Sequence, residues 1–146
     1  MKKTNKRGSV VIGLFCPSND INIGGVMRAI TCYGANSLVI QNKFKRQSTD
    51  TTRGERHIPV FETNDLLENI PYGHIPIAVE IVEEASDLRK FCHPQQAYYI
   101  FGPEGGSVPT RILDKCVHKV YIPTNYCMNL AATVNVVLYD RFLKNG

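Results

Sequence analysis

SVVIGLF, residues 9–15, is the stretch that decides the fold class. It is a short, continuous apolar run rich in β-branched side chains, which is typical of a strand buried on both faces of a parallel sheet. Four further strands are expected, at residues 37–40, 75–82, 97–101 and 119–123. Helices are expected over residues 23–33, 64–70, 87–92, 110–116 and 129–143. This alternation predicts an α/β fold, with a mainly parallel sheet that carries helices on both faces.

The first expected helix has the clearest start and stop signals. Its apolar residues recur at i, i+3, i+4 and i+7 from Ile23 to Tyr33. Asp20 or Asn22 is the expected N-cap, and Gly34 stands where a left-handed residue ends a helix. Later helix starts are expected at Thr63, Ser86 and Pro109.

Length and composition indicate one ordinary globular domain. The chain has 146 residues, of which 43% are hydrophobic and 21% charged. Because no repeat or low-complexity segment interrupts them, residues 9–146 are expected to form a single domain behind a basic tail at residues 1–8. No apolar run approaches the ~20 residues that a membrane-spanning helix needs, so no membrane partner is expected.

The net charge of +4 is unevenly spread. One basic cluster lies in the tail, and a second lies between residues 43 and 56, where it includes Lys45, Arg46 and Arg53. Such clusters are often only a solvated surface, but two of them favour a polyanionic partner such as RNA.

Several kinds of site have little support in the sequence. The five cysteines are scattered and form no CxxC pair, which argues against a disulfide framework and favours a reducing, cytoplasmic compartment. The four histidines show no HxxH or HExxH spacing, so no metal site is expected. Neither a dinucleotide fingerprint nor a GxSxG elbow is present.

Three unusual loops follow expected strands, at the sheet edge where ligands of parallel sheets bind. They are CPSNDINIGG, FGPEGGSVP and IPTNYCMN. Each has a purely structural alternative. The glycines suit a tight turn, Asn22 and Asn129 suit helix caps, and Arg28 suits the solvated side of its helix.

The last expected helix contains LAATVNVVLY, which is apolar on nearly all sides. The arc covered by Leu130, Val134, Val137 and Leu138 looks too wide for one packing face. A terminal helix of a small domain is not easily surrounded by its own chain, so we expect a homodimer.

Taken together, the three loops resemble the three motifs of the SpoU/TrmH-type RNA 2′-O-ribose methyltransferases of the SPOUT superfamily. The matching segments are NIGGVMRAITCYGA, YIFGPEGGSVP and IPTNYCMNLAATVNVVLYD, and the resemblance extends over residues 9–143. It implies S-adenosylmethionine as cofactor and an RNA ribose 2′-hydroxyl as the methyl acceptor. It also implies a C-terminal trefoil knot, and a dimer whose site forms where the first and last helices of two subunits meet.

The resemblance also assigns roles to individual residues. The first motif supplies Asn22 and Arg28, the second Glu104 and the third Asn129 as catalytic residues. Arg28 would face the attacking hydroxyl, either as a base or by orienting it, and a guanidinium is better suited to orienting because it stays protonated. The implied cofactor-binding residues are Val79, Glu80, Gly102, Gly105, Ile122, Cys127 and Met128.

Position 127 departs from the family pattern, since many members have serine where this chain has Cys127. The departure casts doubt on any hydrogen bond that a serine would make there. Lys45, Arg46, Arg53 and the basic tail are the expected RNA contacts. Transfer RNA is the expected substrate. Ribosomal RNA and a non-catalytic RNA-binding role are the alternatives.

Overall fold

The computed structural model describes residues 8–42 and 58–145 of the chain. Its seven strands are β1 (Ser9–Phe15), β2 (Ser37–Gln41), β3 (Val60–Thr63), β4 (Ile75–Val79), β5 (Ser86–Asp87), β6 (Gln96–Phe101) and β7 (His118–Tyr121). Its α-helices are α1 (Asp20–Tyr33), α2 (Thr110–Leu113) and α3 (Leu130–Asn145). Two short 3₁₀ turns span Leu66–Asn69 and Leu88–Lys90.

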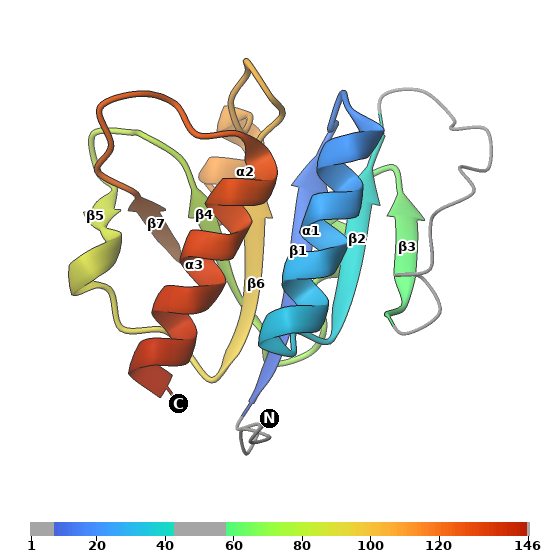
Figure 1. The fold of residues 1–146 in the computed structure, drawn as a ribbon, viewed down its shortest axis with the longest axis horizontal. Coiled ribbons are helices and arrows are strands. Elements are labelled where there is room, and N and C mark those ends of the chain that lie inside the picture. The colour runs from blue at the N-terminus through green and yellow to red at the C-terminus, as the bar shows by residue number, and fades with distance from the viewer. Residues whose placement is uncertain (1–7, 43–57, 146) are drawn as a thin grey trace.

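All seven strands belong to one sheet in the order β3-β2-β1-β6-β4-β7-β5. Every neighbouring pair is parallel, with β1 and β6 at the centre in a register that pairs Ile12 with Tyr99. The predicted α/β class with a parallel sheet is therefore confirmed. Because all strands run the same way, their carboxyl ends gather at one edge, which is the upper edge in Figure 1.

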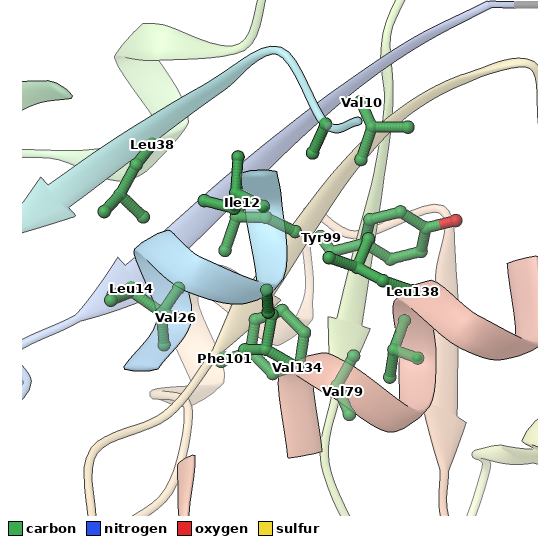
Figure 2. Close-up of a cluster of buried hydrophobic side chains, with 14 of the residues drawn as sticks. Val10, Ile12, Leu14, Val26, Leu38, Val79, Tyr99, Phe101, Val134 and Leu138 are labelled. Atoms are coloured by element: carbon green, nitrogen blue, oxygen red, sulfur yellow. The ribbon is translucent and has the colours of Figure 1, made fainter. Parts of the chain in front are cut away.

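Helices α1 and α3 lie side by side on one face of the sheet (Figure 1). They close over the larger hydrophobic core, to which β1 contributes Ile12 and Leu14 (Figure 2). Val11, between them in sequence, points to the opposite face and packs with Leu66 and Ile112. This alternation is the period of two of a strand, and it confirms a sheet covered on both faces.

Several predicted boundaries were wrong. The strands β3 and β5 were not predicted, because four-residue and two-residue strands carry too little apolar pattern. The helices predicted after Thr63 and Ser86 are single 3₁₀ turns, begun instead by Asp65 and Asp87. Each aspartate accepts a hydrogen bond from the backbone two residues ahead, a local turn that competes with a longer helix.

The helix ends gave mixed results. Asn19, rather than Asp20 or Asn22, caps α1, since its side-chain oxygen accepts from the Ile21 N–H at 2.8 Å. Gly34 ends α1 in the left-handed conformation, as predicted, with a φ of 74°. Asn129 precedes α3, and its Oδ1 accepts from the Ala132 N–H at 2.8 Å, so its predicted capping role is confirmed.

The argument that α3 has too wide an apolar arc named the wrong residues. Leu130, Val134, Val137 and Leu138 are all buried in the core of their own chain. A different set of large apolar side chains on α3 is exposed: Val136, Tyr139, Phe142 and Leu143. The helix thus carries a second apolar surface that its own chain leaves uncovered.

Polar side chains at the C-terminal end of α3 bond to the segment before β6. Arg141 is only 7% exposed and donates to the carbonyls of Pro94 and Gln95 at 2.5 and 2.8 Å. Lys144 donates to the Leu88 and Phe91 carbonyls at 2.6 and 2.9 Å. These bonds fix where α3 lies on the sheet.

His93 lies at the centre of this anchor. Its Nε2 is 2.6 Å from the Asp140 carboxylate and its Nδ1 is 2.6 Å from the Tyr99 hydroxyl. Burial lowers the pKa of His93 and outweighs the opposing effect of Asp140. With a neutral ring, Nε2–H donates to Asp140 and Nδ1 accepts from Tyr99, so both ring nitrogens are satisfied.

The search for a membrane span within residues 8–42 and 58–145 found no helix that is long and apolar enough. The predicted trefoil knot and the predicted domain limits stay predictions.

Candidate functional site

A pocket of about 530 Å³ opens at the carboxyl edge of the sheet, where β4, β6 and β7 end. Its walls are the loops that follow these three strands and the start of α3 (Figure 1). All seven residues expected to bind a cofactor line it: Val79, Glu80, Gly102, Gly105, Ile122, Cys127 and Met128. A volume of this size lies within the ~300–1,000 Å³ typical of small-molecule sites.

The loop after β6 folds back on itself at Gly102. A Cβ added there would lie 2.9 Å from the Val108 nitrogen, so the close backbone approach requires glycine. Glu80 fixes the same loop from the end of β4, because its carboxylate accepts from the Val108 N–H at 2.8 Å. The pocket wall is therefore held in shape by this chain alone.

Glu104 connects this loop to the one after β1. Its Oε2 accepts from the backbone N–H and the hydroxyl of Ser18, at 2.9 and 2.8 Å, and its Oε1 accepts from the Asn22 amide at 2.8 Å. Partial burial acts to raise the pKa of Glu104, but these bonds outweigh it and lower the pKa below its ordinary value. Two of the predicted catalytic residues thus meet in one cluster.

The structure does not bring Arg28 to this cluster within one chain. Arg28 lies six residues after Asn22 on α1, which is roughly 9 Å along a helix axis. Its side chain is exposed and forms no hydrogen bond or ion pair with another residue in ranges 8–42 and 58–145. A catalytic role for Arg28 requires a partner from outside its own chain.

Asn129 stands at the other side of the pocket entrance, one residue after Met128. Its side-chain oxygen is engaged by the Ala132 N–H, and its carbonyl accepts from the Thr133 hydroxyl at 2.9 Å. No hydrogen bond joins it to Glu104 or to Asn22 within the described part of the chain. The structure therefore supports the capping role of Asn129 directly and leaves its catalytic role a prediction.

Ser18 is the residue of this site that was missed from the sequence. It lies in the first of the three unusual loops, which was the one available signal, but a serine in a polar loop is too common to single out. The expected RNA contacts Lys45, Arg46 and Arg53 lie outside the described residues, as do residues 1–7 of the tail.

Solved structures similar to this chain are RNA-modifying enzymes, all of low sequence identity. A TrmH/SpoU tRNA modifying enzyme from A. aeolicus has a TM-score of 0.79 and 18% identity, over 96% of this chain and 79% of its own. A protein described by the 2-OH methylation of C/U34 on tRNA has a TM-score of 0.79 and 20% identity, over 94% and 91%. An AdoMet-bound rRNA methyltransferase from Sinorhizobium meliloti has a TM-score of 0.79 and 19% identity, over 94% and 57%.

At these identities, the likeness to the solved structures shows the fold alone. No curated protein sequence matches the chain. The model of the SpoU rRNA Methylase family matches residues 9–139, which is most of the chain and includes all three loops of the pocket and the Glu104 cluster. The chain therefore belongs to the SpoU family of RNA methyltransferases.

Proposed function

We propose that this protein transfers a methyl group from S-adenosylmethionine to a ribose 2′-hydroxyl of RNA, most probably of tRNA. The observation that carries the proposal is the pocket at the carboxyl edge of the sheet, which adjoins the Glu104 cluster in a chain of the SpoU family. Support for the ribose hydroxyl comes from the similar structure described by 2-OH methylation.

The residues of the pocket fit this cofactor. Val79, Ile122, Met128 and Leu130 provide apolar surface for an adenine ring, while the folded-back loop after β6 provides backbone donors and acceptors. When bound, S-adenosylmethionine supplies a methyl group activated by a positively charged sulfur. Similar proteins with AdoMet bound, including the S. meliloti enzyme, support the assignment.

The polar residues of the site would position the ribose. Arg28 orients the attacking hydroxyl and a neighbouring phosphate, because a guanidinium is a persistent cation with several donors. Glu104, held by Ser18 and Asn22, fixes the loops that the RNA must approach. Most of the rate then comes from positioning the two reactants, since direct methyl transfer needs no covalent enzyme intermediate.

A homodimer would complete this site. The uncovered apolar surface of α3 adjoins Tyr33 of α1, whose ring lies 6.2 Å from Tyr139 and 6.4 Å from Phe142. A second copy packed on this surface would bury it and bring a second α1 helix close. We propose that Arg28 of one subunit acts at the Glu104 cluster of the other.

The RNA is proposed to lie across the pocket entrance and to be held by Lys45, Arg46, Arg53 and the basic tail. Two of the similar structures are described by tRNA, which favours tRNA, and the S. meliloti enzyme keeps ribosomal RNA as the second candidate. A cytoplasmic location is also proposed, with the five free cysteines as its support.

The test is to incubate the purified protein with labelled S-adenosylmethionine and separate pools of tRNA and ribosomal RNA. Nuclease digestion and mass spectrometry then identify the methylated nucleoside. A 2′-O-methylnucleoside from the tRNA pool is expected, and its appearance only from ribosomal RNA favours the second candidate. Methylation of a base, or none in either pool, contradicts the proposal, and Arg28→Ala serves as the inactive control.

A further inference from the structure

Tyr126 is an exposed aromatic residue beside the pocket. It lies in the loop that joins β7 to α3 and arches over the carboxyl edge of the sheet (Figure 1). Its exposed fraction is 87%. Thr124 and Cys127, on either side of it in sequence, line the pocket, whereas Tyr126 does not. The ring therefore stands outside the cavity and next to its entrance.

The backbone at this position is held in a defined turn. The Thr124 hydroxyl donates to the Tyr126 carbonyl at 2.8 Å, and Asn129 fixes the start of α3 three residues later. An exposed ring on a fixed backbone is a preformed surface with little cost of ordering. The segment 122–129 contains no acidic residue, so nothing in it repels a polyanion.

The proposed reaction creates a need for such a surface. A ribose whose 2′-hydroxyl reaches the pocket carries its own base to the pocket entrance. Proteins recognise unpaired RNA bases mainly by stacking them on aromatic side chains, and each stack is worth about 1–3 kcal/mol by alanine substitution. Tyrosine supplies a flat face for any of the four bases.

We infer that Tyr126 is a positioning residue on which the base of the target nucleotide stacks while its ribose enters the site. The inference rests on the proposed function and deepens it, since it says how the enzyme holds an unpaired nucleotide. It identifies the substrate as a nucleotide whose base is accessible, as in a loop, rather than one inside a continuous duplex.

The chain offers a matched control. Tyr72 is also fully exposed, at 101%, but it lies just before β4, at the opposite edge of the sheet. The chain contains no tryptophan, so Tyr126→Trp and Tyr72→Trp each create a single fluorescent reporter. Unfractionated tRNA is the probe, and inorganic polyphosphate serves as a polyanion without bases.

Quenching of the tryptophan at position 126 by tRNA, but not by polyphosphate, is expected, with no quenching at position 72. In methylation assays, Tyr126→Ala should lower kcat/KM for tRNA by about 5-fold to 150-fold, the equivalent of about 1–3 kcal/mol. Tyr126→Phe should stay within about twofold of the wild type because it keeps the aromatic face. Binding of S-adenosylmethionine, measured by calorimetry, should be unchanged in Tyr126→Ala.

Equal quenching at both positions, or equal quenching by polyphosphate, overturns the inference. So does a Tyr126→Ala protein that methylates tRNA like the wild type, in which case the proposed function stands without it. A changed mass of Tyr126→Ala in light scattering also overturns it, since the ring then covers a subunit contact. If the wild type methylates no RNA, the proposed function fails, and the quenching result still decides whether a base stacks at position 126.

Discussion

Polar side chains bond the C-terminal end of α3 to the segment before β6, whereas the loop before its N-terminal end leaves Tyr126 and Cys127 exposed. At the first end, a buried histidine and a buried arginine have partners within the chain. At the second end, the pocket is open and Arg28, on the neighbouring helix, has no partner among the described residues. One end of the helix is finished by its own chain, and the other awaits further molecules.

This difference explains how a small chain builds a site. A buried network holds α3 on the sheet with little freedom, so the loop that leads into the helix is positioned without contacts of its own. The residues at the open end then remain available for a cofactor, an RNA and a second subunit. Substitutions at the two ends should accordingly affect different measurements.

Arg28→Ala should give the largest effect on activity and little effect on folding. Methyl transfer should be lost by at least about a thousandfold, as expected when a residue that acts only in the transition state is removed. Binding of S-adenosylmethionine should stay within a few fold, because Arg28 does not line the pocket. Single-turnover methylation and calorimetry measure the two quantities. Loss of cofactor binding, or surviving activity, would show that the assigned role is wrong.

Arg141→Met should give the largest effect on stability. It removes donors to the carbonyls of Pro94 and Gln95 and to the Tyr99 hydroxyl, and leaves these buried acceptors unpaired. A loss of about 3 kcal/mol in the free energy of unfolding is expected in urea titrations at fixed protein concentration. The exposed Arg111→Met, which breaks a surface pair with Asp65, should cost about 0–1 kcal/mol. Equal costs would mean that the anchor does not hold α3.

His93 should make stability depend on pH in the mildly acidic range. Its pKa in the folded protein is lowered from 6.5, mainly by burial, so the unfolded chain takes up a proton there more readily. Stability from His93 is then fully present above about pH 6.5 and is lost as the pH falls toward the lowered value. Asp140 opposes this shift, while Arg141 and Lys144 add to it.

The measurement is urea unfolding at a series of pH values for the wild type and His93→Gln. The variant should be less stable at neutral pH and should show a flatter dependence between pH 7 and pH 5, which spans the ordinary histidine pKa. An unchanged slope would assign the dependence to other histidines.

Cys127→Ser should give the smallest effect. The thiol is exposed in the pocket wall, and neither a histidine nor a lysine is among the residues that line the pocket. If Cys127 only shapes that wall, serine should change the single-turnover rate by less than about fivefold, or about 1 kcal/mol. A loss beyond about a hundredfold would instead indicate a nucleophile that carries the methyl group.

The sequence was sufficient for the architecture and for most of the pocket. Continuous apolar runs such as 9–15 identify buried parallel strands, and the loops after them must meet at one edge, so the pocket residues could be expected together. The two-residue strand β5 could not be predicted, because its pairing is decided by β7 and not by its own residues. The exposed face of α3 was assigned to the wrong side chains, since periodicity shows that a helix has two apolar faces but not which one its own sheet covers.

The anchor and the Glu104 cluster depend on contacts between residues far apart in the chain. His93 and Asp140 are 47 residues apart, and Ser18 and Glu104 are 86 apart. Nothing in the local sequence marks such pairs, and a serine in a loop or a histidine near a proline has many ordinary explanations. Only the threading of the sheet brings these residues together.

Mixing two inactive variants tests most directly whether a second subunit completes the open end. Arg28→Ala and Glu104→Ala are each purified, shown to have the wild-type mass, and then unfolded and refolded together. If each site takes Arg28 from one subunit and Glu104 from the other, mixed dimers keep one intact site. The mixture should then recover about a quarter of the wild-type activity, from half the dimers with one site of two. A mixture that forms mixed dimers and stays inactive would contradict the account.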